Sequence, residues 1–169
     1  MSRLVVSIID AGGSTNVPTE AQFDQWTKAL SQQLDHTGNI CVRIVSSEEM
    51  EQLNSQFRGK QGLTNVLSFE ADHSDIPMQV LNGNDDLRDF LGDVAICADV
   101  VAAESRAQNK LIEAHWAHLF VHGVLHLCGY DHMEDSEATL MEGLETQILL
   151  AMGYAAPYGN NNEIKTRVS

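Results

Sequence analysis

The sequence predicts one α/β (α+β) domain, in which a small mixed sheet of about four strands packs against about five helices. Apolar runs of strand length alternate with segments of helical periodicity in the first half, and helical periodicity alone continues from Ala98. The length of the chain agrees with a single domain, because 169 residues with 43% apolar content suffice for one hydrophobic core, and no linker divides them. We expect residues 1–156 to form the domain and residues 157–169, which hold few apolar side chains, to be a disordered tail.

Short apolar runs bounded by turn residues predict the strands. They cover residues 4–9, 39–45, 64–69 and 91–97. Apolar residues that recur every three or four positions predict the helices, and Thr19 with Gln22 and Ser46 with Glu49 resemble capping boxes at the first two. The helices begin near residues 19, 46, 98, 111 and 135, and the last three end near residues 108, 128 and 152. The loop over 11–18 and the acidic stretch from Asp72 to Asp89 are expected to be exposed, while the strand order does not follow from the pattern.

Composition argues against several classes of protein. The formal charge of -14, from 10 basic and 24 acidic residues, disfavours broad binding to nucleic acid, so any polyanion must meet a small local patch. No apolar stretch reaches the roughly eighteen residues that span a bilayer, and no signal-peptide pattern precedes the first strand, so we expect a cytoplasmic protein without a membrane partner. Cys41, Cys97 and Cys128 are odd in number and lie in apolar runs, which predicts buried thiols rather than disulfides.

The run HGVLHLCGYDH predicts a metal site. It places His122, His126 and His132 at positions i, i+4 and i+10. The first two lie on one helix face about 6 Å apart along the axis, close enough to share an ion. Gly129 can end the helix in the left-handed conformation, so that the next turn returns His132 toward the other two. Three protein ligands leave a fourth position for water, as in catalytic zinc sites, so we expect one zinc ion per chain, with nickel or copper as substitutes.

Neighbouring side chains offer other ligands, which the geometry disfavours. His118 shares the face of His122 but lies about 12 Å along the axis from His126, so we expect it to support the site or to pack, and His115 to lie on the helix surface. Cys128 stands two residues after His126 and points away from the metal face, which predicts a core residue.

Zinc proteases with a similar outline carry a glutamate after the first histidine, and it acts as their general base. Gly123 occupies that position here, so a hydrolase acting on peptides is disfavoured.

A second cluster lies at the end of the second predicted helix. Arg58 and Lys60 flank Gly59 in a chain that has only 10 basic residues. An arginine fork and a lysine point charge together could receive a phosphate, although two solvated loop cations are an equally good interpretation. Thr64, Asn65 and Ser68 follow, and their pattern alone indicates only strand residues.

Three segments occur in the order FRGKQGLTNVLSF, LGDVAICADVV and the stretch from Glu113 to Tyr154 that contains the histidine motif. Together they resemble the bacterial YbeY family of metal-dependent endoribonucleases, over most of the chain from the first strand to Tyr158. The chain departs from the family at Cys128, where an apolar residue is common, and at Glu70, where a proline is common.

The resemblance implies a zinc-dependent endoribonuclease, specific for single strands, that acts in ribosomal RNA processing and ribosome quality control. Its partners would be single-stranded ribosomal RNA segments and the ribosome or small-subunit assembly proteins. By position, the family's metal-binding histidines match His122, His126 and His132, and its functionally important arginine matches Arg58.

On this hypothesis the metal activates water or polarises a phosphoryl oxygen, while Arg58 acts as the catalytic cation and Lys60 binds substrate. The attacking oxygen, from water or from the ribose 2'-hydroxyl, stays open. An alternative from another class is a non-catalytic ribosome-assembly factor whose metal is structural, which the acidic composition would suit because it favours protein partners over naked RNA.

Overall fold

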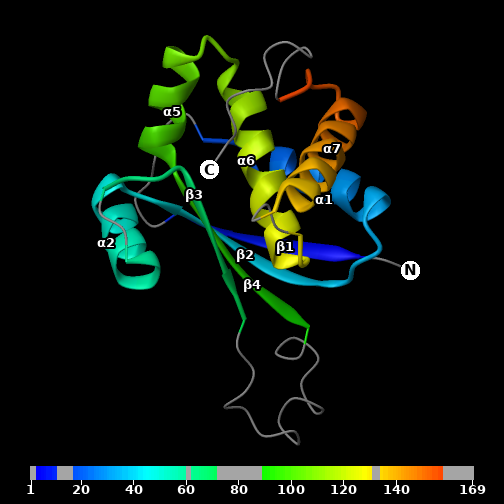
Figure 1. The fold of residues 1–169 in the computed structure, drawn as a ribbon, viewed down its shortest axis with the longest axis horizontal. Coiled ribbons are helices and arrows are strands. Elements are labelled where there is room, and N and C mark those ends of the chain that lie inside the picture. The colour runs from blue at the N-terminus through cyan, green and yellow to red at the C-terminus, as the bar shows by residue number, and fades with distance from the viewer. Residues whose placement is uncertain (1–2, 11–16, 60–61, 72–88, 131–133, 158–169) are drawn as a thin grey trace, which may run out of the picture.

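The fold is built on a mixed sheet in the order β1-β2-β4-β3 (Figure 1). The strands are β1 (Leu4–Ile9), β2 (Gly38–Val45), β3 (Val66–Glu70) and β4 (Phe90–Cys97). β1, β2 and β4 run parallel, whereas β3 pairs antiparallel with β4 and forms one edge. Parallel neighbours require crossover connections, and helices follow β1 and β2 as this demands. The predicted strand positions are confirmed.

The computed structural model describes residues 3–10, 17–59, 62–71, 89–130 and 134–157, and of Arg58 it describes the backbone alone. Several predictions therefore lie outside the described residues. They concern Lys60, His132, most of the two loops over 11–18 and 72–89, and the tail beyond Pro157.

Five helices occur among the described residues, as predicted. They are α1 (Glu20–Gln33), α2 (Ser47–Arg58), α5 (Ala98–Ala107), α6 (Ile112–Leu127) and α7 (Asp135–Ala151). Thr19 and Gln22 form the predicted capping box at α1, in which each side chain bonds the other residue's backbone N–H. Ser46 caps α2 by accepting a hydrogen bond from the Glu49 N–H. These local bonds explain why both helices begin where the pattern predicts.

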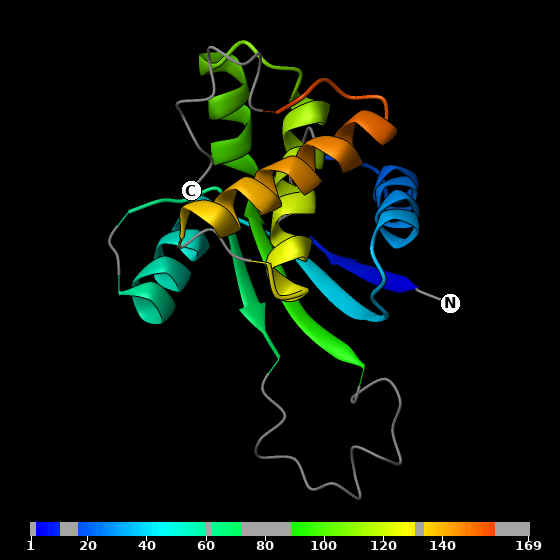
Figure 2. The ribbon, with the colours of Figure 1, turned by 45° about the vertical axis from the view of Figure 1, so that its right-hand side comes forward.

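Helices cover both faces of the sheet. α1 and α6 pack on one face, and α7 lies across α6 on the side away from the sheet (Figure 2). α2 packs on the opposite face through a smaller apolar cluster that includes Met50, Leu67 and Ala95. The predicted central position of the histidine-bearing helix is confirmed, because α6 contacts β3, β4, α1, α5 and α7.

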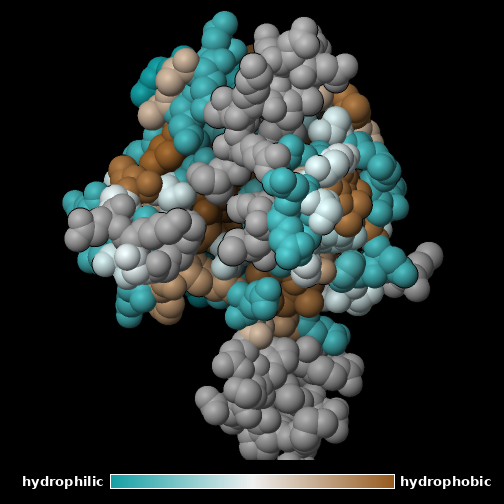
Figure 3. All heavy atoms as spheres, viewed as in Figure 1, coloured by the Kyte–Doolittle hydropathy of each residue, from teal (hydrophilic) through white to brown (hydrophobic). Residues whose placement is uncertain are grey.

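Aromatic side chains fix α6 against α1. Phe23 and Trp26 of α1 meet Trp116 and Phe120 of α6 in edge-to-face and tilted pairs, and all four are at most 2% exposed. Burial of one such side chain contributes about 2–3 kcal/mol, and well-oriented aromatic pairs add about 1 kcal/mol each. This packing means that the histidines of α6 project from a rigid, buried helix. On the face drawn in Figure 3, hydrophobic side chains reach the surface in separate patches.

Candidate metal centre

The histidines of α6 form a buried stripe along the helix. His115, His118 and His122 are 2–3% exposed, and His126, near the end of the helix, is half-buried. Burial of an imidazole is costly unless its nitrogens have partners, so each ring requires a specific environment.

His122 and His126 meet at their outer ring nitrogens. Their Nε2 atoms lie 3.2 Å apart, and the rings cross at 80° with centroids 4.7 Å apart. The i, i+4 spacing on a straight helix produces this convergence, as the sequence predicted. Two neutral lone pairs at this distance repel one another, so the arrangement favours a proton between the rings or a cation in front of both.

Glu145 of α7 holds the other side of His122, and the sequence patterns did not identify it. Its Oε1 lies 2.6 Å from His122 Nδ1 and 3.5 Å from His118 Nε2, and its side chain is fully buried. Burial works to raise the pKa of Glu145, but the hydrogen bonds with His118 and His122 outweigh it and hold the pKa at about 2. The carboxylate is therefore ionised and can only accept hydrogen bonds.

This carboxylate sets the tautomer of His122. Because Glu145 can only accept, Nδ1 of His122 donates to it, which leaves Nε2 of that ring directed at His126. Histidines that bind metals commonly donate their second nitrogen to a carboxylate in this way. Burial lowers the pKa of His118, which therefore stays neutral near pH 7 and donates from Nε2 to the same oxygen. The expectation that His118 supports His122 rather than joining it is consistent with this geometry.

The end of α6 has the predicted conformation. Gly129 has a φ of 99°, and the Tyr130 N–H bonds the Leu125 carbonyl at 3.0 Å, which terminates the helix at Leu127 with Cys128 as its cap. His132, the predicted third ligand, lies just beyond the described residues. Among the described residues no group of three or more His, Cys, Asp or Glu is arranged to hold a metal. Of the three predicted ligands, the described residues thus include the pair His122 and His126, and Glu145 contacts His122 from behind.

Gly123 allows α6 to lie directly on the sheet. A Cβ at this position would come 2.6 Å from Val94 Cγ1 and 3.3 Å from Ser68 Oγ. Ser68 of β3 also donates a hydrogen bond of 2.9 Å to the Gly123 carbonyl. The position after His122 therefore faces the sheet and has no room for the glutamate of a zinc protease. This packing supplies a steric reason for the absence of that base, and it assigns Ser68 a contact that the sequence pattern did not indicate.

Arg58 is the last residue of α2, next to a defined turn. Gly59 has a φ of 65° and bonds back to the Asn54 and Ser55 carbonyls. The Asn54 side chain donates to the Gly62 carbonyl at 3.2 Å, which ties the start of the next segment to α2. The expected position of Arg58 at a helix end is confirmed, whereas the roles of Arg58 and Lys60 stay predictions.

His115 does not lie on the helix surface as expected. It is 2% exposed, and its Nε2 lies 2.9 Å from Glu104 of α5. Asn65, just before β3, donates to the same Glu104 oxygen at 3.1 Å. The surface prediction was wrong because α5 covers this side of α6, which helical periodicity alone cannot reveal.

The three cysteines are free thiols, as predicted, but only Cys97 is fully buried. Cys41 and Cys128 are half-buried, so the expectation of burial was wrong for these two. Burial raises the pKa of Cys128 to about 11, so it is a protonated thiol near pH 7. A thiol packed against the core is a poor metal ligand, in agreement with the sequence argument.

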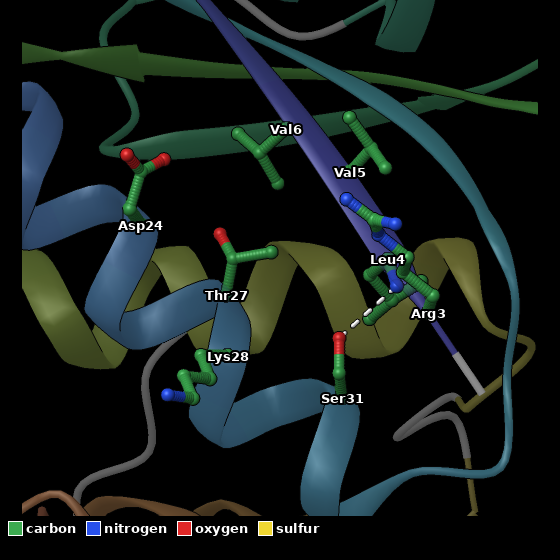
Figure 4. Close-up of a pocket in the computed structure, with 8 residues that line it drawn as sticks. All are labelled: Arg3, Leu4, Val5, Val6, Asp24, Thr27, Lys28 and Ser31. Carbon is green, nitrogen blue, oxygen red and sulfur yellow. Dashed lines mark hydrogen bonds between the residues drawn. The ribbon is translucent and has the colours of Figure 1, made fainter. Parts of the chain in front are cut away.

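Two hollows lie away from the histidine pair. One, of about 290 Å³, lies between α1 and the segment formed by Arg3 and the start of β1, where Ser31 accepts a hydrogen bond from the Leu4 N–H (Figure 4). The other, of about 320 Å³, lies between the start of α6 and the end of α7, and His115 and His118 contribute to its lining. Neither is lined by His122 or His126.

No helix in the described ranges combines the length and apolar character needed to cross a bilayer.

Comparison with known proteins agrees with this fold. The family model described as "Endoribonuclease YbeY" matches residues 10–153. A solution structure of the protein TM1509 from Thermotoga maritima superposes with a TM-score of 0.57 at 24% sequence identity, over 86% of this chain and 86% of that one. The structural likeness supports the fold, and the family match spans α6 with its histidines, Glu145 and the end of α2. The chain therefore belongs to the YbeY endoribonuclease family.

Proposed function

We propose that the chain is a metal-dependent endoribonuclease, specific for single strands, that acts in ribosomal RNA maturation and ribosome quality control. Family membership supplies the reaction class. The observation that carries the metal dependence is the convergence of the His122 and His126 Nε2 atoms at 3.2 Å, with Glu145 bonded behind His122.

The donor set fits zinc. Two nitrogens that each lie about 2.05 Å from one tetrahedral zinc ion are about 3.3 Å apart, close to the separation of the two Nε2 atoms. His122 and His126 would hold the ion, with His132 as the predicted third ligand, and nickel or copper would suit the same donors. A bound zinc would supply Lewis acidity toward a phosphodiester and would make a water molecule acidic enough to react near neutral pH.

The chain's own residues have separate tasks in this proposal. Glu145 keeps the proton of His122 on Nδ1 and fixes the ring against α7. Gly123 and Ser68 hold α6 at a constant depth on the sheet, so that the histidine pair does not shift. Arg58 would neutralise the charge that develops on the phosphate in the transition state, and Lys60 would contribute to binding.

A test compares wild type with His126→Ala and Arg58→Ala on single-stranded and double-stranded RNA, with the metal content of each preparation measured. We expect His126→Ala to lose zinc and cleavage together, whereas Arg58→Ala should keep zinc and lose turnover by at least about a hundredfold. His36→Ala is the matched control, because it removes a histidine that belongs to the connection between α1 and β2 rather than to α6, and it should keep both zinc and cleavage. Full cleavage by a verified metal-free His126→Ala protein would refute the metal dependence.

The product ends separate the two candidate nucleophiles. A 2',3'-cyclic phosphate would indicate attack by the ribose 2'-hydroxyl, whereas a linear phosphate formed directly would indicate attack by water.

The alternative, a non-catalytic ribosome-assembly factor with a structural metal, rests on the net charge of -14, which suits basic protein partners. Restored growth and capture of small-subunit assembly proteins by a cleavage-dead Arg58→Ala chain would favour it.

A further inference from the structure

An exposed aromatic side chain stands directly before Arg58. Phe57 is 60% exposed although it lies in the last turn of α2. Its ring meets that of Phe69 edge-to-face, with centroids 5.2 Å apart and planes at 68°. Phe69 is half-buried and packs on the smaller apolar cluster, so it fixes the ring of Phe57 from one side. The rest of the Phe57 ring faces solvent in a defined orientation.

Strand β3 connects this ring to the histidine pair. Successive residues of a strand point to opposite faces, and here Ser68 reaches α6 beside His122 while Phe69 reaches α2. In two views of the ribbon β3 lies between α2 and the last turns of α6 (Figures 1 and 2). Because β3 is an edge strand, a polymer that approaches His122 and His126 around this edge passes Phe57.

The geometry points to Phe57 as a base-stacking residue that holds a nucleotide next to the one cleaved, while Arg58 meets a phosphate of the same strand. The inference deepens the proposed function and rests on it for the identity of the ligand. Aromatic rings stack on the π-face of any base, so such a contact binds RNA without reading its sequence. Bases in a duplex are already stacked and paired, so the same contact favours single strands.

An aromatic anchor also suits the charge of this chain. With only 10 basic residues against 24 acidic ones, affinity for RNA cannot come from many phosphate contacts. Stacking contributes affinity that does not depend on positive charge. The binding of RNA should therefore depend less on salt than binding by a basic surface does.

Binding of short strands tests the role of the ring. The probes are a single-stranded 2'-O-methyl RNA hexamer and a hexamer of the same length with abasic positions, which keeps the phosphates but lacks bases. We expect Phe57→Leu to weaken binding of the complete hexamer about tenfold, equivalent to about 1.4 kcal/mol, and to leave the abasic hexamer unchanged. Phe57→Tyr should stay within about twofold of wild type, as should Leu111→Ala, which alters an apolar side chain that is 78% exposed at the far end of α6.

Unchanged binding of the complete hexamer by Phe57→Leu, or an equal loss for the abasic hexamer, would overturn the stacking role. Cleavage by wild type is measured separately. If wild type does not cleave RNA although Phe57→Leu weakens hexamer binding, the proposed function fails alone; if wild type cleaves but Phe57→Leu binds normally, only the stacking role fails.

Fluorescence provides a second measurement that does not depend on a loss of affinity. The native Trp26 and Trp116 are 2% and 1% exposed, so an indole introduced by Phe57→Trp would be the one open to solvent. We expect the complete hexamer to quench its emission and the abasic hexamer to leave it unchanged. Leu111→Trp is the control, because position 111 lies about 22 Å along α6 from His126. Equal quenching in both variants, or none in Phe57→Trp, would contradict the proposal.

Discussion

Two histidines of α6, His122 and His115, each lie within 3 Å of a glutamate oxygen, and they differ in the ring nitrogen that the carboxylate contacts. Glu145 of α7 bonds Nδ1 of His122 at 2.6 Å, in full burial. Glu104 of α5 bonds Nε2 of His115 at 2.9 Å, and its side chain is 32% exposed. The two histidines are seven residues apart and lie on the same side of the helix.

The difference separates a candidate metal ligand from a histidine that makes a structural contact. Nε2 is the nitrogen farthest from the backbone, and in His122 it stays directed at His126. In His115 it is already bonded to Glu104, and the remaining Nδ1 is buried with no hydrogen-bond partner among the described residues. His115 thereby joins α6 to α5 and, through Glu104, to Asn65 before β3. A histidine at the correct helical spacing is therefore no sufficient sign of a metal ligand, because the neighbouring helices decide which nitrogen is available.

Of the substitutions that test this comparison, removal of the Glu145 carboxylate should have the largest effect on stability and zinc affinity. Glu145→Ala leaves His118 and His122 buried without their acceptor, so we expect the free energy of unfolding to fall by about 3–5 kcal/mol. The zinc affinity of protein that still folds should fall by about 10–100-fold, because the His122 ring loses its orientation. Thermal denaturation and competition with a zinc chelator measure the two effects. Glu137→Ala changes an exposed carboxylate in the first turn of the same helix, so it should lower stability by less than about 1 kcal/mol and leave zinc affinity unchanged; an effect equal to that of Glu145→Ala would remove the special role of Glu145.

Replacement of each of two helical glycines by alanine should change the stability of the protein by an intermediate amount, and in opposite directions. Gly123→Ala places a methyl group 2.6 Å from Val94 Cγ1, so we expect a loss of about 1–3 kcal/mol in stability and reduced cleavage as α6 is pushed from the sheet. Gly143→Ala in α7 meets nothing within 4 Å and should stabilise the protein by up to about 1 kcal/mol through helix propensity. Chemical denaturation of both variants measures the contrast. Similar stability changes of the same sign would show that α6 does not depend on close contact at Gly123.

The pair at His115 should produce the smallest effect, and one that depends on pH. The hydrogen bond from His115 lowers the pKa of Glu104 below its ordinary value of 4.5, although burial opposes the shift. A depressed carboxyl pKa stabilises the fold above the unfolded value, and this stabilisation is lost as the pH falls through the folded value.

We therefore expect Glu104→Gln to cost about 1 kcal/mol near pH 7 and to flatten the decline of stability below pH 4.5. Zinc content and RNA cleavage should stay at wild-type levels. Denaturation curves between pH 3 and pH 7 provide the measurement, and a loss of zinc in this variant would show that the two pairs of α6 act as one unit.

Local features of this protein follow from the sequence. The capping residues Thr19 and Ser46, the helix end at Gly129 and the shared face of His122 and His126 were all predictable. Each depends on backbone hydrogen bonds and steric preferences that act over a few residues, so a short stretch of chain carries the required information.

Tertiary structure decided which of these features are brought together. Glu145 reaches His122 across 23 positions because α7 crosses α6, and nothing in the helical pattern of α7 distinguishes it from the other glutamates there. The burial of His115, the strand order and the contact between Phe57 and Phe69 depend in the same way on how elements pack. Periodicity identifies which face of a helix is apolar, but the identity of the neighbouring side chain is set by the crossing of whole elements, which no local interaction encodes.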